Sequence, residues 1–145
     1  MTGLLDVNVL IAMVWPAHQA HPRVQHWLGQ HAKEGWASCP FTQTAFVRIL
    51  SNPGFSPNAL TPQEALALLE ANLAHATHCF WPDEISFSEA LKLFSGKLVG
   101  HRQVSDAYLL GLAIHKNGRL VTLDRGILAL PPPKASSKQR IVVIP

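Results

Sequence analysis

Short apolar segments and amphipathic segments alternate along this chain of 145 residues. Five apolar runs have the length of strands and show no alternation with polar residues, at 3–6, 36–40, 77–82, 119–124 and 140–144. Strands that are apolar on both faces are typical of a parallel sheet that helices cover on both sides. The pattern therefore predicts a three-layer α/β/α architecture with a central, mostly parallel sheet of four to five strands.

Helical periodicity fills most of the intervals between these strands. It predicts a helical turn at 8–14, helices at 21–32, 42–51, 61–76 and 104–118, and a short helix around 90–94. Thr61 with Glu64, and Ser86 with Glu89, have the spacing of capping boxes, whereas Thr42 and Ser105 are the expected caps of their own helices. Residues 51–58 and 130–139 are rich in turn-forming residues and are predicted to be surface segments.

The composition narrows the class of protein. Hydrophobic residues make up 48% of the chain and charged residues 14%, which fits one globular domain over 1–145 and not a disordered chain. No apolar run approaches the ~20 residues of a membrane span. The two cysteines form no CxxC pair and the start resembles no secretion signal, so we expect reduced thiols and a cytoplasmic protein. The formal net charge of +3 is compatible with an anionic partner.

Three of the four aspartates fall where a parallel sheet would bring them together. Asp6 ends the first strand, Asp124 ends the fourth, and Asp106 lies in the first turn of the helix between them. The ends of parallel strands and the starts of the following helices share one edge of a sheet. Two like charges 4 Å apart repel by roughly 4 kcal/mol at an effective dielectric constant near 20, so such a cluster needs protons or a cation. Carboxylate oxygens favour Mg²⁺ or Mn²⁺, which can activate water and stabilise phosphoryl transfer.

Each aspartate also has an ordinary structural role open to it. Asp6 could be the N-cap of the turn that follows it, and Asp106 could stabilise the start of its helix through the helix dipole. Asp124 could be a turn residue before Arg125 and Gly126. These roles are compatible with metal binding, because a ligand can also cap a helix.

Four motifs follow one another along nearly the whole chain: LLDVNVLIA, FTQTAFVRILSNP, VSDAYLLGLA and RLVTLDRGI. In this order they resemble the PIN-domain ribonuclease toxins of VapBC toxin–antitoxin modules. The resemblance implies a small α/β domain that cuts RNA with Mg²⁺ or Mn²⁺ held by an acidic cluster. It also implies a homodimer and a cognate VapB-like antitoxin.

The resemblance assigns roles to particular residues. Asp6, Asp106 and Asp124 correspond to the catalytic metal ligands of the family. The candidate supporting residues are Asn8, Gln43, Arg48 and Thr122.

The chain departs from the family pattern in one helix. Members commonly carry a glutamate a few residues before the arginine that Arg48 resembles, and here its place falls to Gln43 or Ala45. Gln43 could offer a neutral oxygen or orient a water, but it cannot act as a base. Ala45 could do neither.

Two other functions stay open, and the missing glutamate motivates the first of them. One is a non-catalytic PIN domain that binds RNA or a protein partner. Another is a phosphatase with Asp6 as its nucleophile, although Asn8 stands where such enzymes place a second aspartate. Zinc is disfavoured, because the histidine pairs at 18 and 21 and at 75 and 78 have no third ligand at a suitable spacing.

Overall fold

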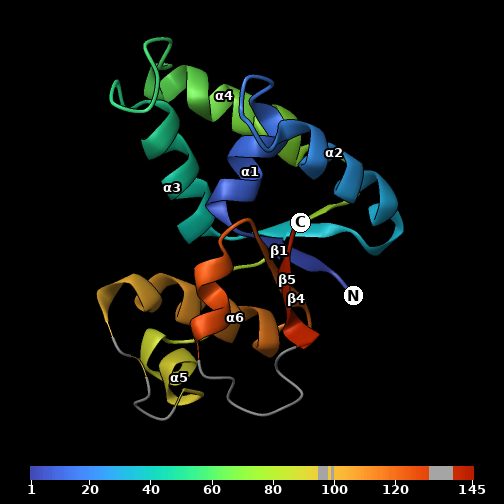
Figure 1. Cartoon of the computed structure of the whole chain (residues 1–145), viewed down its shortest axis with the longest axis vertical. Helices are drawn as coiled ribbons and strands as arrows, with labels where there is room; N and C mark the ends of the chain where they lie inside the picture. The colour runs from blue at the N-terminus through green and yellow to red at the C-terminus, as the bar shows by residue number, and fades with distance from the viewer. Residues whose placement is uncertain (95–97, 99, 131–138) are drawn as a thin grey trace.

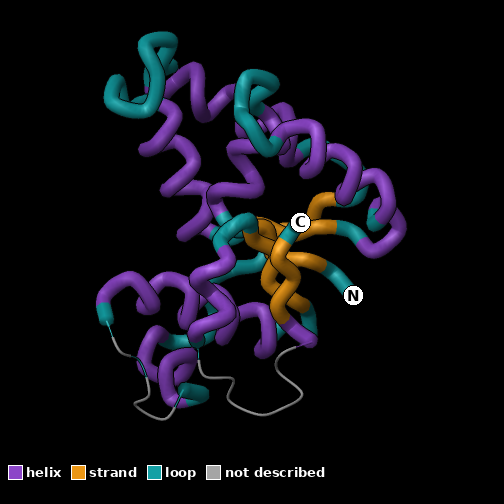
Figure 2. Tube along the Cα trace, in the orientation of Figure 1, coloured by secondary structure: helices purple, strands orange, loops and turns teal. Residues whose placement is uncertain are grey.

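The computed structural model describes residues 1–94, 98, 100–130 and 139–145. Within these residues five strands form one sheet: β1 (Gly3–Leu5), β2 (Trp36–Ser38), β3 (His78–Phe80), β4 (Arg119–Thr122) and β5 (Ile141–Val143). Their order is β3-β2-β1-β4-β5, and all neighbouring strands are parallel. Figure 2 shows the strands at the centre of the molecule, between two groups of helices.

Helices cover both faces of this sheet. Those that the structure describes are α1 (Val7–Val14), α2 (His21–Gln30), α3 (Pro40–Leu50), α4 (Pro62–Leu73), α5 (Phe87–Lys92) and α6 (Val104–His115). Helices α1 to α4 lie on one side and α5 and α6 on the other (Figure 1), so the predicted three-layer architecture is confirmed. None of the described helices is long and apolar enough to cross a membrane.

Each face of the sheet has its own hydrophobic core. Successive side chains of a strand point to opposite faces, and in β1 Leu4 packs with the core under α5 and α6 whereas Leu5 packs with the core under α1 to α4. Leu120 and Val121 of β4 divide in the same way. This two-sided burial explains why the strands read as continuous apolar runs in the sequence.

Both capping boxes form as predicted, but two other helix caps were assigned wrongly. The helix expected from residue 42 begins at Pro40, because proline fits the first turn of a helix, where no N–H is needed. Thr42 therefore lies inside the first turn, and its hydroxyl accepts a hydrogen bond from the Cys39 N–H at 3.1 Å. A 3₁₀ turn leads directly into α6, so its cap is Gln103 and not Ser105. Residues 131–138 of the predicted surface segment lie outside the described residues.

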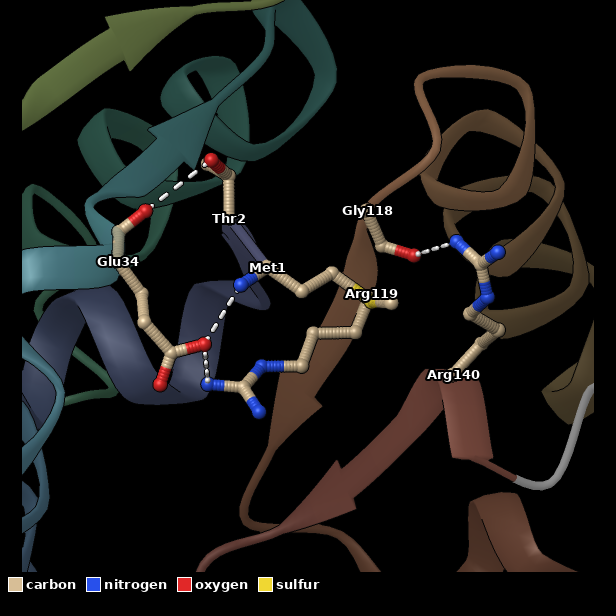
Figure 3. Close-up of polar contacts among 6 residues, drawn as sticks. All are labelled: Met1, Thr2, Glu34, Gly118, Arg119 and Arg140. Atoms are coloured by element: carbon tan, nitrogen blue, oxygen red, sulfur yellow. Dashed lines mark hydrogen bonds and ion pairs between the residues drawn. The ribbon is translucent and has the colours of Figure 1, made fainter.

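Charged contacts join the ends of the strands where the sheet begins (Figure 3). The Glu34 carboxylate accepts a hydrogen bond from the Met1 amino group at 2.7 Å and lies 3.1 Å from Arg119 Nη2. The second contact is an ion pair by distance only, because Nη2 has no aligned hydrogen bond in the described part of the chain. Arg140 Nη1 donates to the Gly118 carbonyl at 3.0 Å. Arg119 is thus at the opposite end of β4 from the aspartate that follows this strand.

Helices α5 and α6 approach so closely that a methyl group would not fit at Gly111, where a Cβ would lie 2.8 Å from the Ala90 Cβ. We expect Gly111→Ala to lower the free energy of unfolding by about 1–3 kcal/mol through overpacking, even though alanine favours helix. Gly29 in α2 has no atom within 4 Å of such a Cβ, so Gly29→Ala should be neutral or stabilising by up to ~1 kcal/mol. Urea denaturation measures both changes, and equal stability of the two variants would contradict the close packing.

Candidate functional site

The three aspartates singled out from the sequence lie at the edge where the parallel strands end, here called the carboxyl edge. The chain winds from β1 to β2 and β3 in one direction, and β4 pairs with the other side of β1. Asp6 directly follows β1, and Asp124 comes two residues after β4. Asp106 lies in the first turn of α6, the helix that precedes β4. In parallel α/β sheets ligands bind at this kind of reversal, outside the carboxyl ends of the strands.

Asp6 is a buried carboxylate that is held on both oxygens. Its side chain is only 7% exposed. Oδ1 accepts a hydrogen bond from the Val7 N–H and Oδ2 from the Thr122 hydroxyl, both at 2.7 Å. Burial raises the pKa of Asp6, the two hydrogen bonds oppose that rise, and the charge of Asp124 adds to it. Asp6 is also the N-cap of α1, so its structural role and its place in the site coincide.

Thr122 is the centre of the polar network at the carboxyl edge. Its hydroxyl donates to Asp6 and accepts from Asn8 Nδ2 and from the Asp124 N–H, both at 3.1 Å. A hydroxyl has one hydrogen and two lone pairs, and all three are used here. Asn8 Oδ1 in turn accepts from the Leu123 N–H at 3.1 Å. The ends of β1 and β4 are therefore tied together by side chains as well as by the sheet.

The other two aspartates are held less tightly. Asp124 is exposed, and its Oδ1 accepts from the Gly126 N–H at 2.7 Å, so it makes the turn that its sequence context predicted. Within the described residues no group donates a hydrogen bond to the Asp106 carboxylate. Burial and, after it, the negative charges of Asp6 and Asp124 raise the pKa of Asp106 to about 6. The structure thus brings the three carboxylates, here called the acidic cluster, close enough to act on one another.

Comparison with known proteins identifies the family. The family model for the PIN domain matches residues 3–131. Ribonuclease VapC39 of Mycobacterium tuberculosis is 42% identical over 127 residues, which cover 88% of this chain and 91% of the relative. Ribonuclease VapC38 of the same species is 38% identical over 143 residues, which cover 98% and 99%. The chain belongs to the VapC group of PIN-domain proteins.

Solved structures show the same PIN fold at much lower identity. VapBC2 from Rickettsia felis, bound to a DNA fragment from its promoter, matches with a TM-score of 0.65 and 13% identity, over 99% of this chain and 97% of that chain. DNA-bound VapBC from Salmonella typhimurium matches with a TM-score of 0.63 and 14% identity, over 91% and 94%. The family resemblance predicted from the four sequence motifs is confirmed by the family model and by the relatives of 38–42% identity.

This PIN domain has a hydrogen-bonded chain where the family commonly has a glutamate. Gln43 Nε2 donates to Ser38 Oγ at 2.9 Å, and Ser38 Oγ lies 2.8 Å from His78 Nε2. His78 Nδ1 faces the Leu73 carbonyl at 3.0 Å. The proton must therefore be on Nδ1, so Nε2 accepts from Ser38, and burial lowers the pKa of His78. The Gln43 amide is engaged with β2 and β3, and the sequence pattern gave no sign of this chain.

Two further residues of the family motif do not join the polar network of the PIN domain. Ala45 is buried within α3. Arg48 is exposed in the last turn of α3, and its guanidinium makes no hydrogen bond or ion pair in the part of the chain that the structure describes. Of the four candidate supporting residues, the structure therefore brings Asn8 and Thr122 to the aspartates and gives no contact of Gln43 or Arg48 with them.

The acidic cluster has the donor chemistry for a divalent cation, on which PIN ribonucleases generally depend. Among the described residues, no three His, Cys, Asp or Glu side chains are gathered tightly enough to enclose an ion. Mg²⁺ does not need such an enclosure, since it keeps several waters and binds through one or two carboxylates. No positive charge of the described residues is among the groups that shift the pKa of Asp6 or Asp106. Among the described residues, no positive charge therefore offsets the negative charges of Asp6 and Asp106, and the donor set fits a cation.

Replacing the Thr122 hydroxyl should loosen the whole network. Thr122→Val keeps the shape of the side chain but leaves three polar groups without their partner. We expect the free energy of unfolding to fall by about 1–3 kcal/mol, whereas Thr44→Val on the exposed face of α3 should stay within ~0.5 kcal/mol of the parent. The pKa of Asp6 should rise further, because the Thr122 hydrogen bond lowers it. Urea denaturation and carboxyl NMR titration measure these effects, and identical behaviour of the two variants would refute the role of Thr122.

The raised pKa of Asp106 should make the stability of the metal-free protein fall with pH. Its native pKa is about 6 against an ordinary value of 3.8, so between these values the native state keeps a proton that the unfolded state has lost. Asp106→Asn cannot ionise, so we expect it to be more stable than the parent above pH ~6 and to lose this advantage toward pH ~4. Thermal unfolding in EDTA measures the difference in stability between the two proteins. The raised pKa of Asp6 affects both proteins, so its contribution largely cancels in this difference. A difference that does not change with pH would contradict the prediction.

Proposed function

We propose that this PIN domain is an endoribonuclease that hydrolyses RNA phosphodiester bonds with Mg²⁺ or Mn²⁺, as the toxin of a type II VapBC toxin–antitoxin module. The observation that carries the proposal is the acidic cluster at the point where the winding of the sheet reverses. No positive charge of the described residues is among the groups that shift the pKa of Asp6 or Asp106. Relatives at 37–42% identity are named as VapC ribonucleases, which supports RNA as the substrate.

The residues that would hold the cation are Asp6, Asp106 and Asp124. A divalent ion bound there supplies the positive charge that activates a water and stabilises the phosphoryl group. Hydrogen bonds from Thr122 and Val7 fix both oxygens of Asp6, so this ligand would need little reorganisation when the ion binds. A bound cation would also favour the ionised form of Asp106 and lower its raised pKa.

The proposal includes partners. The two solved neighbours are VapBC structures, which supports a cognate VapB-like antitoxin for this chain, and we expect a homodimer acting in the cytoplasm. Large apolar side chains are exposed at Leu66 on α4, Phe80 at the end of β3 and Leu128 after β4. Exposed apolar surface of this kind is available for contact with another protein chain.

A second candidate is a PIN domain that binds RNA without cutting it. One observation favours it: the place of the family glutamate is taken by Gln43, a neutral side chain that donates to Ser38, or by the buried Ala45. RNA that stays intact in Mg²⁺ and in Mn²⁺, although the protein binds it, would support this candidate over the nuclease.

Removing one carboxylate of the cluster tests the nuclease directly. We expect Asp6→Asn and Asp106→Asn each to lower the cleavage rate at least ~100-fold, because the cation loses a ligand and a negative charge. The measurement is single-turnover cleavage of a labelled RNA with Mg²⁺ or Mn²⁺, and excess EDTA should stop it. Glu70→Gln, on the exposed side of α4, removes the same charge away from the cluster and should cleave like the parent. If Asp6→Asn or Asp106→Asn cut as fast as the parent, the assignment of the cluster would be wrong.

A further inference from the structure

The carboxyl edge also carries a pocket beside the acidic cluster. It has a volume of about 390 Å³, within the range of small-molecule binding sites. The residues that matter for its chemistry are Phe41, Asp83, Phe87, Ser105 and Tyr108. Phe41 follows β2, Asp83 follows β3, and Ser105 directly precedes Asp106 of the cluster. The pocket, here called the side pocket, therefore continues the same edge of the sheet.

The walls of the side pocket are aromatic and open to solvent. Phe41 is 41% exposed and Phe87 54% exposed, although burying a phenyl ring is favourable by about 1.5–3 kcal/mol. Their ring centroids lie 6.0 and 6.3 Å from that of Tyr108, which is buried between them and the core. Exposed aromatic rings around a hollow are the surface on which proteins stack unpaired bases of single-stranded RNA.

The charged group of the side pocket is the Asp83 carboxylate, which accepts hydrogen bonds and does not donate them. The Tyr108 hydroxyl donates to Asp83 Oδ1 at 2.6 Å and so fixes this carboxylate, while Oδ2 carries no hydrogen bond in the described part of the chain. A carboxylate selects a ligand with N–H donors. Guanine presents two adjacent donors, N1–H and the 2-amino group. Adenine and cytosine place a ring acceptor beside their amino group, and uracil has one N–H between two carbonyls.

We propose that the side pocket binds a guanine of the RNA substrate close to the bond that is cut. The base lies against Phe41 and Phe87 and donates N1–H and its 2-amino group to Asp83, and Tyr108 is a positioning residue for that carboxylate. This inference rests on the proposed nuclease function. β2 and β3 are the first and second neighbours of β1 on one side, so at ~4.8 Å per strand the side pocket is about 5–10 Å along the edge from the end of β1.

The test uses an RNA in which the cuts by the parent protein have been mapped. Each guanine near a cut is replaced in turn by inosine, which keeps N1–H and lacks the 2-amino group. At one of these guanine positions we expect the parent to cut the inosine RNA about 5- to 150-fold more slowly than the guanine RNA. Asp83→Asn should cut the guanine RNA more slowly and treat the two RNAs alike, whereas Glu70→Gln should discriminate like the parent. Tyr108→Phe should reduce the guanine-to-inosine ratio, an effect that a loss of stability alone would not produce.

Binding in EDTA gives a readout that does not depend on the cation. We expect Phe87→Ala to weaken the binding of both RNAs about 5- to 150-fold in fluorescence anisotropy, because a stacking surface is lost. Circular dichroism and thermal unfolding check that each variant is folded.

The outcomes separate the inference from the function on which it rests. If the parent cuts RNA but no guanine can be distinguished from inosine, or if Asp83→Asn still discriminates, the guanine subsite is wrong and the nuclease stands. If the parent neither binds nor cuts RNA, the proposed function fails and the subsite fails with it. An arginine of a protein partner could also donate two N–H groups to Asp83. If variants of the side pocket such as Asp83→Asn still distinguish guanine from inosine but lose affinity for an antitoxin or a second copy of the chain, a protein fills the side pocket and the guanine subsite is wrong.

Discussion

The hydrogen bond from the Thr122 hydroxyl to Asp6 joins the two strands between which the winding of the sheet reverses. Burial alone would drive the Asp6 carboxyl to its neutral form, and the hydrogen bonds from Thr122 and Val7 oppose this. The same hydroxyl accepts from the Asp124 N–H and from Asn8, so one side chain sets the positions of two carboxylates. Asp6 directly follows β1, and Asp124 lies in a hydrogen-bonded turn two residues after β4, so the positions of these two carboxylates depend on the sheet.

The cluster is a cost to the fold that protonation or a bound cation can relieve. Three carboxylates share one edge, and the pKa of Asp106 is raised to about 6 because burial and two like charges oppose its ionisation. The two apolar cores on either side of the sheet supply the stability that tolerates this repulsion. A species that binds the native cluster and not the unfolded chain stabilises the protein by mass action. A cation bound at the acidic cluster, as proposed, would therefore also stabilise the fold.

The sequence predicted what depends on local pattern or on topology. Short-range spacing and the rule for parallel sheets predict three features of the structure. These are the strands buried on both faces, the capping boxes at Thr61 and Ser86, and the location of Asp6 and Asp124 at strand ends. The predicted start of α3 at Thr42 was wrong. The rigid ring of Pro40 fits the first helical turn, so the helix begins there and Thr42 does not cap it. The hydrogen bonds that link Gln43, Ser38 and His78 could not be predicted, since Ser38 and His78 are 40 positions apart in the sequence. Sequence spacing does not reveal which side chains meet across the register of two strands.

The strand order also separates the acidic cluster from the side pocket along the carboxyl edge of the sheet. The acidic cluster belongs to the ends of β1 and β4 and the start of α6, whereas the side pocket is built from segments that follow β2 and β3 together with α5 and α6. The Thr122 network makes no hydrogen bond with Phe41, Asp83 or Phe87 in the part of the chain that the structure describes. Substitutions at these three positions can therefore change which ligand the edge prefers without moving the carboxylates at the reversal point. Tyr108, which lies on α6, is buried in the core and donates to Asp83. It therefore couples the side pocket to the packing of the helix that carries Asp106.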